Sequence, residues 1–415
     1  MGILEVLGGR GLIAQITHED ELRDHLADGV RTAYTGYDPT ADSLHVGHLI
    51  TIMALRRWQK AGHRIAVVMG GGTGIVGDPT GKTEMRKMLT GEQIEINIGR
   101  QVAQIGKLVN LTDPQKGIVV NNADWLAKLQ YLPFLQDIGR HFSVNRMLTA
   151  ESVKQRLEKG LTFLEFNYML LQSYDFLHLY RTEKVTVQLG GDDQWSNMLG
   201  GVELVRRLEA EKAFCVTLPL LTTSDGRKMG KTEGGAVWLD PQKTTPFDFF
   251  QYWRNIDDDM VIKCLNYLTE VQESEVSALA KLEGSEINGA KIRLAFEVTK
   301  LVHGEEEAQK AKDTAASLFA GGGAPLDIPQ LYVGRADFKD GMDVGSFLVL
   351  AGIAASKKEV MRLIEQGGLH FNDKKVDTIK DSVGLKAVEE GLLIRRGKKH
   401  YYRVLFSDES TFRGV

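Results

Sequence analysis

Two histidines flank a glycine in the stretch His45-Val-Gly-His48. The preceding residues 30–37 are β-rich, Asp38-Pro39 breaks that run, and apolar residues recur at helical spacing from Val46 onward. Both imidazoles are therefore predicted at the N-terminus of a helix, where free N–H groups and the helix dipole favour anions. We predict a phosphate site in which Gly47 leaves room for a flat ring. Taken alone, the pattern fits two ordinary surface histidines equally well.

A second cationic pattern lies some 180 residues further on, in Gly226-Arg-Lys-Met-Gly-Lys-Thr232. Lys228 and Lys231 are three residues apart in a loop with glycine hinges, which suits a mobile clamp for a polyphosphate. Alone, this stretch also fits a solvated charged turn. Both patterns in this order are much less expected by chance, so together they indicate a triphosphate site.

A third pattern is the mostly apolar segment from Phe163 to Phe176, which is predicted to be a helix. Tyr168, Gln172 and Asp175 stand at i, i+4 and i+7 and therefore share one face. Polar groups on a buried helix need partners. They either bond within the core or form the wall of a pocket for a small polar molecule.

The elements that must position these residues alternate between strand and helix. Apolar runs at 64–69, 118–120 and 185–189 follow the strand at 30–37, and helical patterns separate them. This alternation predicts a doubly wound parallel sheet, in which ligands bind at the carboxyl ends of the strands. Each of the three patterns falls at such an end or on a helix face near one.

The glycine-rich stretch after residue 69 allows two other nucleotide folds. Gly72-Thr-Gly-Ile-Val-Gly77 fits the GxGxxG pattern of dinucleotide-binding folds, although turn residues follow it and the expected acid is missing. Residues 77–83 imitate a Walker A loop, but Val76 stands where its first glycine belongs. Both alternatives remain open and are the weaker readings.

Composition limits the class of protein. A chain of 415 residues with 43% hydrophobic and 26% charged residues suits a globular protein of two or three domains. A net charge of −4 argues against a wholly basic nucleic-acid coat protein. Cys215 and Cys264 form no CxxC pair, so we predict reduced thiols and no protein-bound metal. No signal-like segment or membrane-length apolar run is seen, so we predict a cytoplasmic chain without membrane contact.

The carboxyl-terminal part carries a separate signal. Residues 320–325 read as a glycine-rich linker, and Arg395-Arg-Gly-Lys-Lys-His-Tyr-Tyr-Arg403 interleaves basic and aromatic residues. This interleaving suits phosphate contact with base stacking, as in RNA binding. A charged hairpin is the alternative reading.

Together these stretches resemble a known family, the class I aminoacyl-tRNA synthetases. His45-Val-Gly-His48 matches the HIGH signature with Val for Ile, and Lys228-Met-Gly-Lys-Thr232 is similar to the KMSKS loop. The glycine in that loop is typical of bacterial tyrosyl-tRNA synthetases, which the chain resembles over essentially its whole length. Residues 351–367 also resemble the S4 RNA-binding module.

The resemblance implies a fold and its domains. The expected fold is α/β, with a Rossmann-like doubly wound parallel sheet, then an all-helical domain and a small α+β S4-like domain. The implied divisions are a catalytic domain with a helical insertion at 1–220, a KMSKS-type loop and linker at 221–246, a helical anticodon-binding domain at 247–319, a linker at 320–340, and the S4-like RNA-binding domain at 341–415.

The resemblance also implies roles for individual residues. Those at the phosphates, counted as catalytic, are Thr40, His45, His48, Lys82, Arg86, Lys228 and Lys231. Those that bind the rest of ATP are Thr35, Gly36, Asp38, Gly47, Thr51, Gly191 and Asp193. Those that bind tyrosine are Tyr34 and Asp175 at the phenol, Asp78, Tyr168 and Gln172 at the ammonium, and Gln194 near the carboxylate. Thr35 departs from the Cys of many relatives, which puts its ribose contact in doubt.

The implied reaction is ligation of tyrosine to tRNA(Tyr). ATP is a substrate and arrives with Mg²⁺, the partners are L-tyrosine and tRNA(Tyr), and the family forms homodimers. The region around Phe163 is the expected part of the interface. The alternatives are a tryptophanyl-tRNA synthetase, which the Tyr34/Asp175 pair disfavours, a non-catalytic RNA-binding protein, and a dinucleotide-dependent oxidoreductase.

Overall fold

The computed structural model describes residues 2–78, 89–158, 160–223, 226–232, 235–319, 330–372, 374–397 and 400–407. Two compact units make up the chain. The first comprises Met1–Thr245 and Asn255–Val302, and the second comprises Pro246–Arg254 and His303–Val415.

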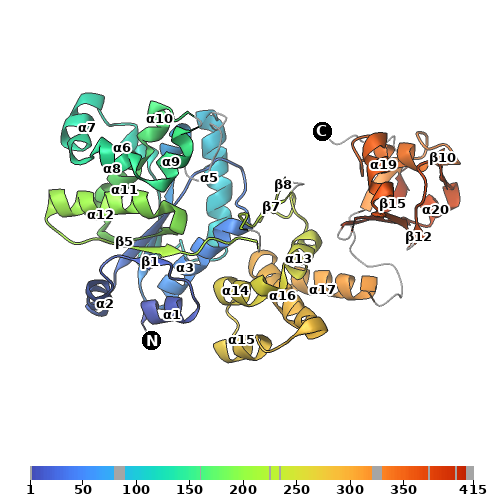
Figure 1. The fold of residues 1–415 in the computed structure, drawn as a ribbon, viewed down its shortest axis with the longest axis horizontal. Coiled ribbons are helices and arrows are strands. Elements are labelled where there is room, and N and C mark those ends of the chain that lie inside the picture. Colours follow the sequence, from blue (N-terminus) through green and yellow to red (C-terminus); the bar gives the residue numbers. More distant parts are fainter. Residues whose placement is uncertain are drawn as a thin grey trace. The chain divides into compact units, whose positions relative to one another are not determined.

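A mostly parallel sheet forms the centre of the first unit (Figure 1). Its strands among the described residues are β1 (Gln15–Ile16), β2 (Thr32–Tyr37), β3 (Arg64–Met69), β4 (Gly117–Asn121), β5 (Val185–Gly191) and β6 (Phe214–Leu218). Their order is β1-β6-β5-β2-β3-β4, and β1 alone of these runs antiparallel to its neighbour. The chain changes direction across the sheet between β2 and β5, so a ligand crevice is expected at their carboxyl ends.

Helices cover both faces of this sheet, because the side chains of each strand alternate between them. On one face Tyr34 of β2 packs into a cluster with Phe176 and Leu177. On the other, the hydroxyl of Tyr37 meets Thr51, which lies on α3. Figure 1 shows α11 and α12 on one side of the sheet and α3 on the other. The doubly wound α/β architecture predicted from the sequence is confirmed.

The helices of the first unit are short except around the sheet. Those before residue 245 are α1 (Ile3–Gly9), α2 (Glu19–Ala27), α3 (Leu49–Lys60), α4 (Thr73–Val76), α5 (Gly91–Gly106), α6 (Ala123–Leu126), α7 (Tyr131–Asp137), α8 (Val144–Leu148), α9 (Glu151–Leu157), α10 (Phe163–Phe166), α11 (Tyr168–Glu183) and α12 (Trp195–Glu209). Short 3₁₀ turns occur at Val46–His48, Gly139–His141, Asp192–Gln194 and Gly284–Glu286. A small hairpin, β7 (Lys231–Thr232) with β8 (Gly235–Ala236), follows β6.

Two local expectations need revision. The segment expected as one helix from Phe163 is two, because the chain breaks at Asn167 between α10 and α11. The glycine-rich stretch after β3 forms only the four-residue α4, which ends at Gly77 with a φ of 83°. A GxGxxG motif in a dinucleotide-binding fold instead opens a long helix that packs on the sheet.

Three further helices complete the first unit: α14 (Asp258–Leu268), α15 (Glu273–Leu279) and α16 (Ile287–His303). Two arginines hold the carboxyl end of α14. Arg57 of α3 donates to the carbonyls of Asn266, Tyr267 and Thr269, and Arg10 donates to those of Asn266 and Thr269. The last carbonyls of a helix lack partners within it and attract cations, so this contact attaches α14 to α3.

The second unit contains α13 (Pro246–Arg254) and α17 (Glu305–Phe319), followed by a carboxyl-terminal α+β domain. The strands of that domain in the described part are β9 (Gln330–Gly334), β10 (Met342–Asp343), β11 (Leu369–Phe371), β12 (Lys374–Lys375), β13 (Ser382–Val383), β14 (Leu392–Arg396) and β15 (His400–Ser407). Its helices are α18 (Val344–Leu350), α19 (Lys357–Glu365) and α20 (Leu385–Glu389). One sheet has the order β12-β11-β14-β15-β9, and its core centres on Phe347, Val360 and Ile394.

We expect Arg57→Met to lower the free energy of unfolding by about 3 kcal/mol, because buried carbonyls at the end of α14 lose their donors. Arg57 is 5% exposed, and burial together with the nearby Arg10 lowers the pKa of its guanidinium to about 9. Chemical denaturation measures the change. Lys60→Met is the control: its ion pair with Glu270 is half exposed, so a loss below about 1 kcal/mol is expected. Equal losses in both variants would contradict this account.

Candidate active site

A cavity of about 400 Å³ opens at the carboxyl ends of β2 and β5. Its position is the point at which the strand order reverses, where open α/β sheets bind ligands. The candidate residues from the sequence that line it are Tyr34, Thr35, Gly36, Asp38, Thr40, His45, Gly47, His48, Thr51, Asp78, Tyr168, Gln172, Asp175, Gly191 and Gln194. Side chains from β2, α3, α11 and the end of β5 thus meet around one space.

A buried carboxylate marks one part of the cavity. Asp175 is 4% exposed, and it accepts hydrogen bonds from Asn122 Nδ2 at 2.9 Å and Trp125 Nε1 at 2.7 Å. Burial raises the pKa of Asp175 to about 7, although these two bonds oppose the rise. The same carboxylate and burial raise the pKa of the Tyr34 phenol. A carboxylate held this way suits a neutral polar ligand group that can donate a hydrogen bond.

Four buried oxygens of cavity residues have no hydrogen-bond partner among the described residues: Tyr34 Oη, Gln101 Oε1, Gln172 Oε1 and Gln188 Oε1. Gln188 lies beside Tyr34 in the parallel pairing of β5 with β2. Buried polar atoms without partners are uncommon in folded proteins and cost free energy. Their gathering around one cavity indicates that a polar ligand completes their hydrogen bonding.

Asp38 lies between the sheet and α11. Its carboxylate accepts from Thr73 Oγ1 at 2.9 Å and from the Tyr168 hydroxyl at 3.1 Å. Across the cavity, Gln194 Nε2 donates to Asp78 at 2.8 Å. Both acids thus accept hydrogen bonds from neutral side chains at the wall of the cavity.

The His45–His48 turn holds both imidazoles in one tautomer. His45 Nδ1 accepts from the backbone N–H of Gly47 at 3.0 Å, and His48 Nδ1 accepts from the N–H of His45 at 3.1 Å. Since Nδ1 is the acceptor in each neutral ring, Nε2 carries the proton and is the donor. The ring centroids are 4.0 Å apart. The turn therefore presents two N–H donors side by side at the start of α3.

Only glycine fits at position 47. A Cβ there would lie 2.7 Å from Cε1 of the His45 ring. Gly230 of the lysine-containing loop is similarly constrained, because its φ is 86° and a Cβ would lie 2.7 Å from Val46. The two signature segments therefore approach each other closely.

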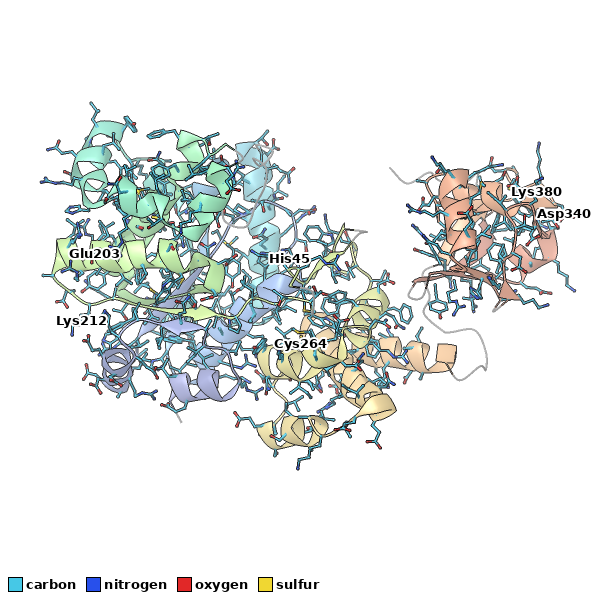
Figure 2. The ribbon with its side chains drawn as sticks, in the orientation of Figure 1. His45, Glu203, Lys212, Cys264, Asp340 and Lys380 are labelled. Carbon is cyan, nitrogen blue, oxygen red and sulfur yellow. The ribbon has the colours of Figure 1, made fainter. Side chains whose placement is uncertain are left out.

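Backbone hydrogen bonds join these segments directly. Val46 N–H donates to the carbonyl of Val237 at 3.0 Å, and Leu239 N–H donates to that of Leu44 at 2.8 Å. Val237 N–H in turn bonds to the carbonyl of Gly230, so the chain returns from the lysines straight onto the histidine turn. Figure 2 shows His45 in this region, near the start of α3 and the β7–β8 hairpin.

One lysine of the loop is already paired. Lys228 Nζ lies 2.6 Å from Asp193 Oδ2, and both side chains are partly exposed. Asp193 follows Gly191 at the end of β5, so this contact links the loop to the strand end. Neither Lys228 nor Asp193 lines the cavity as the structure has it.

Some of the residues predicted from the sequence lie outside the described part of the chain or are engaged by other groups. Lys82 and Arg86 lie outside the described residues, as does the side chain of Lys231. Thr35 donates its hydroxyl to the carbonyl of Leu189 at 3.1 Å, so it can offer a ligand only an acceptor. No group of three or more His, Cys, Asp or Glu side chains suited to a metal ion occurs in the part of the chain that the structure describes.

Among the residues that the sequence interpretation missed are Thr73, Asn122 and Gln188, which line the cavity, and Trp125, which donates to Asp175. Two had visible signals. Asn122 directly follows a predicted strand, and Gln188 is a polar residue inside an apolar one. Trp125 was hidden because its donor role depends on Asp175, which lies 50 residues away along the chain.

Comparison with known proteins agrees with this geometry. Residues 28–320 match the family described as tRNA synthetases class I (W and Y), and residues 327–404 match the tyrosine–tRNA ligase SYY-like C-terminal domain. The chain is 53% identical to a tyrosine–tRNA ligase of Clostridium botulinum, over 98% of this chain and 99% of that one. It is 52% identical to one of Caldanaerobacter subterraneus, over 98% of this chain and all of that one.

A solved structure has the same fold. The C-terminally truncated mitochondrial tyrosyl-tRNA synthetase of Aspergillus nidulans superposes with a TM-score of 0.68 at 29% identity, covering 77% of this chain and 94% of that one. The relatives match the chain almost from end to end. The chain therefore belongs to the tyrosyl-tRNA synthetases, a family of class I aminoacyl-tRNA synthetases.

Proposed function

We propose that this chain activates L-tyrosine with ATP and transfers it to the 3′-terminal adenosine of tRNA(Tyr). The observation that carries the proposal is the buried Asp175 beside the unpartnered Tyr34 hydroxyl. A phenol donates its proton to the carboxylate and accepts from Tyr34, which pairs all three groups. Phenylalanine would leave Tyr34 unpaired, and unpaired buried polar groups are costly.

The rest of tyrosine binds further along the same cavity. Its ammonium group meets Asp78, Tyr168 and Gln172, which supply negative charge and acceptors. Its carboxylate lies near Gln194, which already donates to Asp78. The amino acid is thereby held with its carboxylate toward the nucleotide.

Activation is an in-line displacement. A tyrosine carboxylate oxygen bonds to the α-phosphorus of ATP, and the bond from that phosphorus to the pyrophosphate oxygen breaks. No nucleophilic side chain is needed, so positioning and charge stabilisation supply the catalysis. The Nε2–H donors of His45 and His48 and the hydroxyl of Thr40 face the phosphates.

Cations complete the phosphate site. Lys82, Arg86, Lys228 and Lys231 neutralise the charge that develops on pyrophosphate. Lys228 first leaves Asp193, with which it is paired here. Mg²⁺ enters on the phosphates of ATP as part of the substrate, since its preferred ligands are phosphate oxygens and water.

The adenosine lies over the start of α3. Gly47 lets the adenine approach the backbone, because glycine has no side chain to stand between them. Thr51, Gly191 and Asp193 hold the ribose. The remaining nucleotide contacts are Thr35, Gly36 and Asp38.

The carboxyl-terminal domain binds tRNA through one face of its sheet. His370 pairs with Arg395, and Arg395 with Tyr401, across neighbouring strands, so these side chains share a face. Ile394, the next residue on β14, points into the core instead. His370 and Arg395 on this face suit phosphate contact, whereas Tyr401 is 8% exposed and is not presented for base stacking. The helical segment at 247–319 contacts the anticodon end.

The active form is a homodimer in the cytoplasm. Large apolar side chains are exposed on neighbouring helices of the insertion, with Phe163 67% and Leu157 48% exposed. The buried ion pair of Arg156 with Glu165 ties these two helices together, which fixes the apolar surface. Exposed apolar patches commonly mark interfaces. None of the described helices has the length and apolar character needed to cross a membrane.

Tyr34→Phe is expected to reduce the ratio of kcat/KM for tyrosine over phenylalanine by about tenfold, because one hydrogen bond to the phenol is lost. Pyrophosphate exchange with each amino acid measures the ratio. Tyr180→Phe, which removes a hydroxyl outside the cavity, is the matched control and should leave the ratio unchanged. An unchanged ratio in Tyr34→Phe would remove the basis of the phenol assignment.

Tyrosine affinity is expected to weaken about tenfold between pH 8 and pH 6. The pKa of Asp175 is about 7 in the free protein, and the phenol donates to the ionised carboxylate. Below pH 7 the Asp175 carboxyl is mostly protonated and must lose its proton before tyrosine binds, whereas above pH 7 it is already ionised. Dissociation constants of tyrosine measured by calorimetry across this pH range test the prediction. Asp175→Asn is the control, because its side chain does not titrate and its tyrosine affinity should not change with pH. A flat wild-type profile would show that tyrosine binds both protonation states equally.

Phe163→Asp is expected to convert the dimer to a monomer, since a charge at the centre of the apolar surface must be desolvated on association. Sedimentation velocity measures the state. Val30→Asp is the control, because Val30 is equally exposed, at 66%, but lies outside the insertion. If Phe163→Asp stays dimeric, the interface lies elsewhere.

A further inference from the structure

The loop that joins β2 to the His45–His48 turn carries functional groups but little regular structure. Asp38 and Thr40 stand on it, and it ends at His45. Loops of this kind depend on neighbouring elements to satisfy their backbone groups and fix their conformation. The position of the phosphate donors therefore depends on what holds residues 39–44.

One face of α5 performs this task with amide side chains. Asn97 Nδ2 donates to the carbonyl of Pro39 at 2.9 Å, and Gln101 Nε2 donates to that of Ala41 at 2.8 Å. Positions 97 and 101 are one turn apart, and both side chains are 2% exposed. A buried amide N–H₂ group is costly unless paired, so these two contacts indicate a specific fit between α5 and the loop, while Gln101 Oε1 has no partner among the described residues.

The third amide of this face, Gln104, reaches a shared node at Ser43. Gln104 Nε2 donates to Ser43 Oγ at 3.0 Å, and Gln104 Oε1 accepts from Leu44 N–H at 2.8 Å. Ser43 is 2% exposed, and its hydroxyl donates to the carbonyl of Leu44 at 2.8 Å. Each polar atom of the Gln104 side chain is thus bonded to the loop.

The same hydroxyl also touches the segment that follows the lysine loop. Asp240 N–H donates to Ser43 Oγ at 3.3 Å, beside the bond from Leu239 N–H to the carbonyl of Leu44. Ser43 Oγ therefore lies between α5 on one side and residues 239–240 on the other. Three segments meet there: α5, the loop at residues 39–44, and residues 239–240, which follow the lysine loop.

Surface ion pairs form a second connection between the same segments. Asp42 accepts from Arg100 of α5 at 2.8 Å and pairs with Lys243 at 2.5 Å. The Arg100 side chain is 56% exposed. Exposed ion pairs contribute little, so the buried Ser43 node is the stronger of the two connections. Arg100 therefore offers a natural control on the same helix.

We propose that Ser43 and Gln104 are positioning residues for the triphosphate site. Gln104 lies outside the cavity, and Ser43, which lines its edge, uses its hydroxyl to bond Gln104, Leu44 and Asp240. Together they hold in register the three chain segments that carry or adjoin the donors and cations of the site. Along the chain, Lys82 and Arg86 precede α5. Thr40 lies in the loop that ends at His45, and Lys228 precedes residues 239–240. This inference rests on the proposed function. Ser43 and Gln104 align the groups that bind ATP. The residues that bind tyrosine do not depend on them.

Ser43→Ala and Gln104→Met test the proposal in the full-length protein. Each should lower kcat/KM for ATP in tyrosine-dependent pyrophosphate exchange by about tenfold, and calorimetric ATP affinity should fall in the same sense. The tyrosine dissociation constant should stay at the wild-type value, because Asp175 and Tyr34 lie outside the node. Loss of fold would lower both affinities, so the split between the two ligands separates positioning from stability.

The double variant and the surface control sharpen the result. Ser43→Ala combined with Gln104→Met should cost little more than either alone, since both remove one shared hydrogen bond. Arg100→Ala should leave ATP affinity unchanged. Wild-type ATP affinity in both single variants, or an equal fall in tyrosine affinity, would overturn the proposal. If the wild type itself shows no exchange with tyrosine, the proposed function fails, and ATP affinity alone then decides the role of the node.

Discussion

The site depends on a short antiparallel backbone pairing between residues 44–46 and 237–239. It joins the histidine turn at the start of α3 to the chain returning from the lysine loop, although the two segments are about 190 residues apart. Backbone bonds hold position independently of side-chain identity, so the loop lysines can change partners while their attachment stays fixed. Gly230 is needed because a Cβ there would collide with Val46 across this contact, and Gly47 because a Cβ there would collide with the His45 ring of its own turn. The sheet edge then supplies the other wall of the cavity.

The second constraint is electrostatic. Asp175 is a buried carboxylate held by the neutral donors Asn122 and Trp125, and its pKa of about 7 reflects the free-energy cost of ionising it there. A protein that kept this group only for stability would do better with an apolar residue. The cost makes sense if a ligand hydroxyl offsets it, and the unpartnered Tyr34 hydroxyl points to the same ligand. Specificity for a phenol and the free-energy cost of the buried polar groups thus have the same structural origin.

The sequence was sufficient for strands β2 to β5, the His45–His48 turn and the polar face of α11, because each rests on local periodicity or on spacing within a few residues. It was insufficient where partners are distant. Trp125 and Asn122 could not be assigned without knowing that Asp175 lies beside them. The strand at Phe214–Leu218 was not predicted. The Ser43 node was likewise invisible, since serine and glutamine 61 residues apart carry no pattern. Lys82 and Arg86 rest on sequence alone, as they lie outside the described residues.

The most direct test of the central claim is ATP–pyrophosphate exchange by the purified wild-type protein with each of the twenty amino acids in turn. This account predicts exchange with tyrosine alone, because only a phenol pairs Tyr34 and Asp175 together. Exchange with tryptophan instead would keep the fold and the phosphate site but contradict the assignment of the pocket. No exchange with any amino acid, from folded protein that binds tRNA, would contradict the catalytic account and leave an RNA-binding protein.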